Sequence, residues 1–395
     1  MLKVIELFAG VGAQAEALSR IGIDYKIIGI SEIDKYAIQS YIKLHGNTKN
    51  FGDITKIEQL PEADLWTYSF PCTDISIAGK QDGFDIGSST RSSLLWEVKR
   101  LLLKSKETGT LPKYLLMENV KAIVSSKFVD NFNEWLNVLN LLGYKSFYKV
   151  LNAKDYGIPQ NRERVFVFSI LDSNADFEFP KPVVLNLKLK DMLEDVVDEK
   201  YYLSKKLINC FMDNKNRNGY VRSKRFRPQK KNANYAFTIT TSPGNRVSDN
   251  FIIEPNLNIE CIESLKGCGL PWDNMNDSSC RVYSVDGVSS TLDSMQSGHR
   301  QPKIMLYNNR RLDDSNNARI RKLTPRECWR LMGWKDDRID KVMDGAISNT
   351  QLYKQAGNSI VVNVLEAVFR EMFINQLDRK ATKEEPKNVK ELKLF

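Results

Sequence analysis

A cysteine directly after a proline stands where an apolar run ends in this sequence. The run from Leu65 to Phe70 is rich in β-forming residues, so Cys72 follows a predicted strand at the edge of an α/β sheet. Pro71 fixes its own φ and biases Phe70 towards an extended conformation, which presents the thiol from a defined backbone. A thiolate there is a good nucleophile for an electron-poor ring carbon, if a positive or dipolar environment ionises it. The alternative is a buried structural cysteine.

An acid and two arginines are predicted to reach the same sheet edge as Cys72. Glu118 ends an apolar run, and Arg162 and Arg164 stand directly before another. A carboxyl group at Glu118 could hydrogen-bond the ring nitrogen and amino group of a heterocycle and make the ring more electrophilic. The arginines could supply the positive charge that the thiol needs. The alternative is a surface acid and a solvated arginine pair.

A glycine-rich turn from Phe8 to Gly12 joins the first predicted strand to a helix, and glycines there let a nucleotide approach the backbone. The turn lacks the full Gly-x-Gly-x-x-Gly fingerprint, which disfavours a nicotinamide-dependent oxidoreductase. Glu32, at the end of the second predicted strand, could accept hydrogen bonds from ribose hydroxyls. Asp53, expected after the third strand, could bind an adenine amino group. Each acid alone is more often a solvated loop residue, but together with the turn they predict an adenosine-type cofactor.

Positive charge is concentrated in one segment of a basic chain. The 395 residues carry a formal net charge of +9, which favours an anionic partner, with nucleic acid as the first candidate. The segment from Asn214 to Lys231 holds eight basic residues, no acid, and two interleaved aromatic residues, Tyr220 and Phe226. Such a run suits contacts to phosphates. A solvated loop is the alternative.

Strands and helices alternate through the first 171 residues, which predicts a doubly wound parallel sheet with right-handed crossovers. Strands are predicted over 3–8, 26–30, 64–70, 114–118, 146–151 and 165–170. Helices are predicted over 13–21, 35–44, 94–105 and 128–142, with a long loop over 78–93. From about residue 172 to 321 regular periodicity fades, and two Thr-rich segments there both end in a Gly-x-Arg turn, at Arg246 and Arg300.

The C-terminal part returns to helical patterns. A capped helix is predicted to begin at Pro325, and the segment over 351–360 is predicted to lead into an apolar helix that ends near residue 377. The last residues, 379–395, are mostly charged and are predicted to be frayed or disordered.

Cysteine and histidine usage disfavours a metal site. The six cysteines form no Cys-x-x-Cys pair and there are only two histidines, so neither a zinc site nor a disulfide framework is expected. We expect the protein to lie in a reducing cytoplasm. The first residues are typical of a strand that contains an acid, not of a signal peptide. No segment approaches the length of a membrane span.

The order of these motifs resembles that of the C5-cytosine DNA methyltransferase family, of bacterial or phage type. The stretches that carry the resemblance run from residue 3 to 375 and comprise Glu6-Leu7-Phe8-Ala9-Gly10-Val11-Gly12, Ser69-Phe70-Pro71-Cys72, Glu118-Asn119-Val120, Gln160-x-Arg162-x-Arg164, Arg321-Lys322-Leu323-Thr324-Pro325-Arg326-Glu327-Cys328 and Gly357-Asn358-Ser359. Several independent motifs at matching spacing are far more specific than any one of them.

The resemblance implies a fold, a reaction and a cofactor. The fold would be the Rossmann-like S-adenosylmethionine-dependent methyltransferase fold, a doubly wound mixed sheet with a smaller target-recognition domain. Cys72 would attack C6 of a cytosine flipped out of duplex DNA, Glu118 would contact N3 and the exocyclic amine, and Arg164 would bind the base with Arg162 in support. The methyl group of S-adenosylmethionine would go to C5, and the loop over 78–93 would close over the site.

Further residues follow from the same resemblance. The cofactor site would be lined by Phe8, Gly10, Gly12, Glu32, Ile33, Asp53, Ile54, Leu94 and Asn358. Contacts to DNA would come from Thr73, Ser76, Arg91, Arg222, Lys224, Arg225, Arg227, Arg246 and Arg300. Two departures concern binding: Thr73 replaces the family's usual Gln, and residues 87–90 look like an insertion in the loop.

These observations predict a sequence-specific DNA (cytosine-5)-methyltransferase that acts as a monomer, independently of any cognate restriction endonuclease. No long regulatory extension precedes the first strand, in keeping with a compact bacterial or phage enzyme. The expected domains are 1–171 for catalysis and cofactor binding, 172–345 for target recognition, 346–377 returning to the catalytic domain, and the tail over 378–395. An RNA cytosine-5 methyltransferase and a catalytically dead DNA-binding regulator are the alternatives.

Overall fold

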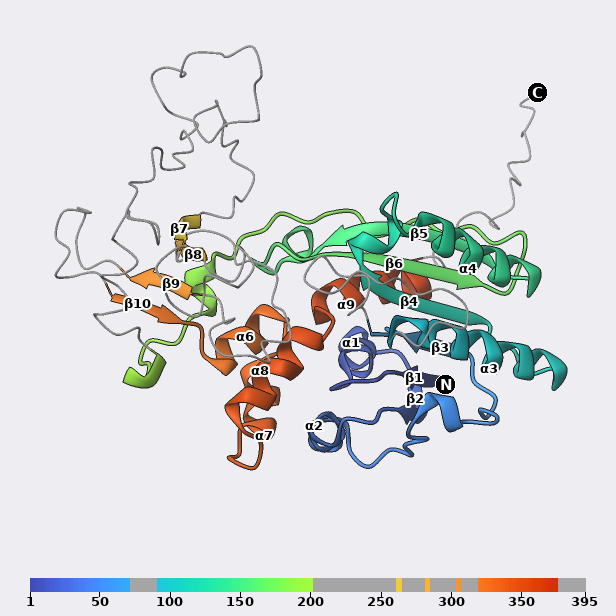
Figure 1. Ribbon diagram of the computed structural model, residues 1–395, viewed down its shortest axis with the longest axis horizontal. Coiled ribbons are helices and arrows are strands. Elements are labelled where there is room, and N and C mark those ends of the chain that lie inside the picture. The colour runs from blue at the N-terminus through green and yellow to red at the C-terminus, as the bar shows by residue number, and fades with distance from the viewer. Residues whose placement is uncertain (72–90, 202–260, 265–280, 285–302, 307–318, 376–395) are drawn as a thin grey trace, which may run out of the picture.

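A six-stranded sheet in the order β2-β1-β3-β4-β6-β5 forms the centre of the chain (Figure 1). The computed structural model describes residues 1–71, 91–201, 261–264, 281–284, 303–306 and 319–375. The strands are β1 (Leu2–Leu7), β2 (Tyr25–Ser31), β3 (Leu65–Tyr68), β4 (Tyr114–Val120), β5 (Lys145–Asn152) and β6 (Glu163–Ile170). β1 pairs with β2 on one side and β3 on the other. The chain order therefore reverses between β1 and β3, the point at which doubly wound sheets bind ligands.

The sheet is mixed, because β6 runs antiparallel to both β4 and β5. An entirely parallel sheet, predicted from the alternation of strands and helices, is therefore wrong at β6. The physical reason is the connection between β5 and β6, which holds the short 3-10 helix η4 (Ala153–Tyr156) and no crossover helix. A strand that follows such a connection can only return beside its predecessor in the opposite direction. The mixed doubly wound fold implied by the family resemblance is confirmed.

Successive residues of the strands face two different helix layers, since side chains alternate across a strand. On β1, Val4 belongs to a core shared with α1 (Ala13–Ile21) and α9 (Val362–Arg370). Its neighbour Ile5 belongs to a core shared with α3 (Leu95–Glu107) and α4 (Val129–Leu141). Helices thus cover both faces and leave the strand ends for chemistry.

The remaining described helices include the two predicted over 35–44 and from Pro325, and several that were not predicted. They are α2 (Lys35–His45), α6 (Pro325–Leu331), α7 (Asp336–Val342), α8 (Asn349–Asn358) and the π-helical η9 (Glu371–Asn375), with short 3-10 helices η1 (Ile54–Lys56), η2 (Arg91–Leu94), η3 (Lys121–Val124), η5 (Leu189–Met192) and η6 (Glu199–Tyr201). One prediction needs correction, because the segment over 351–360 is itself largely helical. The extended backbone of Ser359, with ψ 158°, separates α8 from α9.

A smaller sheet in the order β10-β9-β8-β7 lies at one end of the molecule, and α6, α7 and α8 lie between it and the central sheet (Figure 1). Its strands are β7 (Cys261–Ser264), β8 (Arg281–Ser284), β9 (Lys303–Leu306) and β10 (Arg319–Lys322). Buried residues of α6, α7 and α8 belong to the same core as α1 and α9. These helices are therefore packed directly onto the catalytic sheet.

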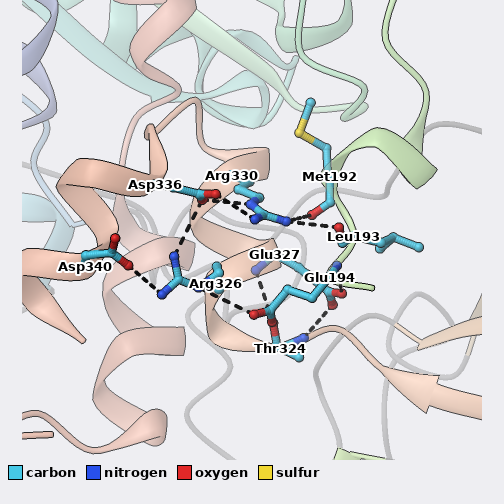
Figure 2. Close-up of polar contacts among 9 residues, drawn as sticks. All are labelled: Met192, Leu193, Glu194, Thr324, Arg326, Glu327, Arg330, Asp336 and Asp340. Carbon is cyan, nitrogen blue, oxygen red and sulfur yellow. Dashed lines mark hydrogen bonds and ion pairs between the residues drawn. The ribbon is translucent and has the colours of Figure 1, made fainter. Parts of the chain in front are cut away.

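The buried carboxylate of Glu327 accepts hydrogen bonds from two described chain segments, the one that ends at residue 201 and the one that resumes at residue 319. Figure 2 shows Glu327, which is 0% exposed, between Glu194 on one segment and Thr324 on the other. One oxygen of Glu327 accepts from the backbone N–H of Glu194 at 2.9 Å, and the other from that of Thr324 at 2.8 Å. Thr324 also caps α6. Because losing a partner of a buried polar group costs about 1–3 kcal/mol, this carboxylate fixes both segments against α6.

An arginine of α6 reinforces the same junction (Figure 2). Arg330 donates to the carbonyl oxygens of Met192 and Leu193 at 3.2 and 3.0 Å. Its other guanidinium nitrogens bind both carboxylate oxygens of Asp336 on α7 at 2.8 and 2.7 Å. The segment at Met192 and Leu193 is thereby fixed against α6.

Candidate active site

The turn after β1 has an unusual backbone. Phe8 lies in the left-handed region with φ 57°, which is rare for a bulky residue and often marks a functional site. Gly10 has φ 58°, and no described atom lies within 4 Å of the position that a Cβ atom would occupy there. Gly12 differs, since a Cβ atom would meet the rings of His45 and Tyr41 at 2.5 and 2.6 Å. Gly10 thus faces open space, and Gly12 packs against α2.

The carboxylate of Glu32 joins this turn to the end of β2. One oxygen accepts from the backbone N–H of Gly10 at 2.8 Å. The other accepts from the N–H groups of Ile33 and Asp34, both at 2.8 Å. A carboxylate has about four lone-pair sites, so Glu32 retains capacity for a ligand hydroxyl. Ile33, beside it, is 73% exposed and presents a bare apolar side chain.

Asn50 organises the loop that carries Asp53. Its amide oxygen accepts from the N–H groups of Glu32 and Gly52, and its amide nitrogen donates to the carbonyl of Glu32. Asn50 forms only an isolated bridge with Ile30, so the expectation that Asp53 follows the third strand is wrong. Asp53 instead caps η1, and the third strand comes later. The side chain of Asn50 bonds the N–H and the carbonyl oxygen of Glu32, which a longer strand would pair through its backbone.

The other residues expected at the cofactor site differ in exposure. The side chain of Ile54 is buried in the core that includes α3, and its carbonyl accepts from Arg100. Leu94 ends η2 and is partly buried. Asn358 is the exposed last residue of α8.

Glu118 and Arg164 meet at the other part of the sheet edge. Glu118 lies opposite Phe166 in the ladder, so Arg164 is its diagonal neighbour on the same face. The Nε atom of Arg164 lies 3.3 Å from a Glu118 carboxylate oxygen, and both side chains are largely buried. Burial raises the pKa of Glu118, while Arg164, Arg162 and the Ser69 hydroxyl act to lower it. The carboxyl group therefore holds a proton more readily than a solvated acid does.

Asn119 connects this acid to the segment that leads to Cys72. Its side chain is buried and donates from Nδ2 to the carbonyl oxygen of Phe70 at 3.1 Å. Its amide oxygen accepts from the N–H of Val120 at 2.8 Å. The peptide between Phe70 and Pro71 is therefore fixed beside Glu118.

Arg162 contacts the C-terminal segment. Its Nη2 atom donates to the carbonyl oxygens of Gly357 and Ser359, both at 2.9 Å, and the residue is 4% exposed. The side chain also lowers the pKa of Glu118 through its charge.

Most of the residues predicted to contact DNA, and the predicted nucleophile, lie outside the described ranges. Arg91 is the exception among them, and it begins η2. The residues outside are Cys72, Thr73, Ser76, Arg222, Lys224, Arg225, Arg227, Arg246 and Arg300, together with most of the loop over 78–93.

Comparison with known proteins decides the family. A profile of C-5 cytosine-specific DNA methylases matches residues 2–374, nearly the whole chain. The chain belongs to this family. The methylase is 36% identical to the type II methyltransferase M2.ScrFI of Lactococcus lactis subsp. cremoris, over 95% of this chain and 100% of that protein. It is 31% identical to the orphan methyltransferase M.SPBetaI of Bacillus phage SPbeta, over 96% and 99% respectively.

Solved structures share the fold of the methylase. An Entamoeba histolytica methyltransferase, EhMeth, matches with a TM-score of 0.64 at 16% identity, over 94% of this chain and 98% of that one. A putative DNA modification methyltransferase encoded within an Escherichia coli prophage matches with a TM-score of 0.58 at 19% identity, over 96% and 100%. These structures confirm the fold, while the family profile and the sequence relatives confirm the predicted family and enzyme class.

The sequence did not indicate Asn50, and it indicated Phe8 and Asn119 as motif residues without showing the strained backbone of the first or the hydrogen bonds of the second. Asn119 stood in a recognised motif, but its bond to Phe70 joins residues 49 positions apart. Asn50 lies in a short polar stretch whose composition indicates only a loop.

Two negative findings concern only the described part of the methylase. Within it no group of histidine, cysteine, aspartate and glutamate side chains could hold a metal ion. None of its helices combines the length and apolar character that a membrane crossing requires.

Proposed function

We propose that this methylase is a sequence-specific DNA (cytosine-5)-methyltransferase that flips its target cytosine out of the duplex and bonds it covalently to Cys72. The observation that carries the proposal is the pair of Glu118 and Arg164 beside the fixed Phe70–Pro71 peptide. A base must leave the helix to reach such a site, at a cost of about a few kcal/mol.

Each group of the base-binding half has a stated task. The thiolate of Cys72 forms a bond to C6, and the electron pair of the C5–C6 double bond moves towards C5. Glu118 in its protonated form donates its proton to N3 and accepts from the exocyclic amine, which offsets the negative charge that develops on the ring, while Arg164 binds the base and Arg162 supports it. After methyl transfer, C5 loses its proton to solvent, the double bond reforms and the bond from C6 to sulfur breaks. N3 returns its proton to Glu118 when the bond from C6 to sulfur breaks.

The residues at the β1 and β2 ends fit S-adenosylmethionine. Open space beside Gly10 admits a ligand to the backbone, and Glu32 retains acceptor capacity for ribose hydroxyls. Ile33 is exposed enough to cover an adenine ring, and Asp53 uses only one carboxylate oxygen in its bonds to Thr55. Other lining would come from Phe8, Gly12, Ile54, Leu94 and Asn358. Bound there, the cofactor would supply an electrophilic methyl group.

DNA recognition falls to the part of the region over 172–345 that precedes α6, because α6 and α7 already pack on the central sheet together with the segment over 346–377. Phosphate and base contacts would come from the residues predicted above, above all the basic run over 214–231, and from Thr73, Ser76 and Arg91. Neutralising Arg225 and Arg227 together should lower the salt dependence of DNA affinity by about one slope unit per lost phosphate contact. If the dependence of DNA affinity on salt concentration did not change, the run over 214–231 would be a solvated loop that makes no phosphate contacts. We further propose that the protein acts as a monomer in the cytoplasm, without a bound endonuclease.

Bisulfite sequencing of DNA from a host that expresses the chain tests the function and identifies the site. The expected result is 5-methylcytosine at one short sequence, absent with Cys72→Ser. A Cys72→Ser variant with near-normal methylation would refute the nucleophile. Methylation of transfer RNA instead of duplex DNA would refute the substrate. Failure to trap the protein on DNA that contains 5-fluorocytosine would refute the covalent step.

A further inference from the structure

Helix α8 is attached to the start of α2 through two polar side chains. The ammonium group of Lys354 lies 2.6 Å from a carboxylate oxygen of Asp34. Gln355 donates to the carbonyl oxygen of Tyr36 at 2.9 Å and accepts from the buried hydroxyl of Ser40 at 3.0 Å. α2 begins directly after β2, so these contacts fasten α8 to the cofactor side of the sheet edge.

The last residues of α8 are also attached to the base-binding side. Arg162 donates to the carbonyl oxygens of Gly357 and Ser359, both at 2.9 Å. Arg162 directly precedes β6, which carries Arg164, the partner of Glu118. Carbonyl groups at the end of a helix have no partner within the helix, so Arg162 satisfies acceptors that would otherwise need water.

Asp34 transmits the attachment to the predicted ribose acid. One oxygen of Asp34 caps α2 by accepting from the N–H groups of Tyr36 and Ala37, and the other pairs with Lys354. The backbone N–H of Asp34 donates to Glu32 at 2.8 Å. Lys354 therefore pairs with Asp34, and the backbone N–H of Asp34 in turn donates to the carboxylate of Glu32.

The two attachment points are far apart in the sheet. Strands β1, β3 and β4 separate β2 from β6, and neighbouring strands lie about 4.8 Å apart. The residues of α8 and its C-cap that make these contacts, from Lys354 to Ser359, lie within little more than one turn, so this turn joins two elements that the sheet holds apart. The last residue of α8, Asn358, is exposed and lies between the two residues whose carbonyl groups bind Arg162.

We propose that α8 is a brace that sets the separation between the cofactor acid and the base-binding pair, with Lys354 and Arg162 as positioning residues. The proposal rests on the proposed function, since it assigns methyl donor and base to these two halves. Transfer between two bound molecules requires the reacting atoms to approach within about 3–3.5 Å, and a misplacement of about 1 Å can cost roughly a hundredfold in rate. A helical turn that is bonded to both elements limits such misplacement.

The methylase contains a matched control for Lys354. Lys43 lies 2.6 Å from Asp344 and likewise joins α2 to the C-terminal part, but at the end of α2 remote from Glu32. Lys354→Met and Lys43→Met each remove one ammonium group and keep the aliphatic stem. If the Lys354 pair served only to dock the segments, both variants would behave alike.

The experiment uses the full chain, S-adenosylmethionine and a DNA duplex that carries the site mapped by bisulfite sequencing. Calorimetry gives the cofactor Kd, and single-turnover methylation at saturating cofactor gives the rate. For Lys354→Met we expect a Kd about fivefold higher and a rate about tenfold lower, in line with a shift well under 1 Å. For Lys43→Met we expect both within about twofold, with a similar change in Tm. Lys354→Arg should restore most of the rate.

A second comparison tests the route through Glu32. In a Glu32→Gln background, Lys354→Met should raise the Kd by less than about twofold, because the acceptor that it positions has lost its charge. Equal losses for Lys354→Met and Lys43→Met, or full additivity with Glu32→Gln, would overturn the brace while the wild type stays active. A wild type that binds no S-adenosylmethionine would instead refute the proposed function, and the brace with it.

Discussion

Two acids at the same sheet edge are held in opposite ways. Glu32, after β2, is bonded by three backbone amides, the most distant 22 residues away in the chain. Glu118, on β4, is largely buried and paired with the side chain of Arg164 on β6. Fixed amides hold the oxygens of Glu32 in place, whereas burial raises the pKa of Glu118 and the arginine lowers it. The first arrangement suits binding and the second suits chemistry.

The largest expected effect separates the two acids by function. Glu118→Gln keeps the size of the side chain but removes its ionisation, so the single-turnover rate should fall by about 10²–10⁴, the range for a lost acid–base group. The cofactor Kd should change by less than about twofold, because Glu118 lies on the other half of the edge. A near-normal rate would show that the two acids do not differ in this way.

Replacing the arginine partner should have a smaller effect on the same half. Arg164→Lys keeps a positive charge but loses the rigid fork that holds Glu118. We expect the rate to fall by about tenfold to a hundredfold, less than for Glu118→Gln. The pKa that governs the pH–rate profile should rise, because the carboxylate loses stabilisation. A pH–rate profile that is the same in Arg164→Lys and in the wild type would show that Arg164 does not influence the ionisation of Glu118.

The reciprocal change at the cofactor half should act mainly on binding. Glu32→Gln weakens hydrogen bonds to a charged acceptor, worth about 1.5–3 kcal/mol each, of which a part is regained by the neutral amide. The Kd for S-adenosylmethionine should rise by about tenfold, measured by calorimetry. If instead the rate at saturating cofactor fell as far as for Glu118→Gln, the contrast between the two acids would be lost.

A third acid, behind the cofactor turn, should affect stability alone. Glu6 is fully buried, and burial raises its pKa to about 7, although Tyr41 and the backbone of Ala15 lower it. Because the folded pKa exceeds the unfolded value, its contribution to the free energy of unfolding is largest below about pH 4.5 and declines as pH rises to about 7. Denaturant titrations should show this decline in wild type relative to Glu6→Gln, at about 1.4 kcal/mol per pKa unit at most. A difference independent of pH would contradict the raised pKa.

Much of the fold could be predicted because its determinants are local. The alternation of buried residues gave the strands, and Thr324, Pro325 and Glu327 mark the start of α6, whose capping box is present. The reversal of β6 was missed because a short connection without a helix looks much like any other loop in sequence. The place of Asp53 was misjudged for a similar reason, since Asn50 forms one bridge rather than a strand.

The sequence by itself indicated the family, which the comparisons confirm, and the candidate chemical groups, since Cys72, Glu118 and Arg164 stand in motifs whose residue types and order are specific. Only the tertiary structure decided how those groups are held. The contact from Arg162 to Gly357 joins residues 195 positions apart, and that from Lys354 to Asp34 joins residues 320 apart. Periodicity and propensity report on near neighbours in the chain. Contacts at such separations depend on how the packed layers bring distant segments together.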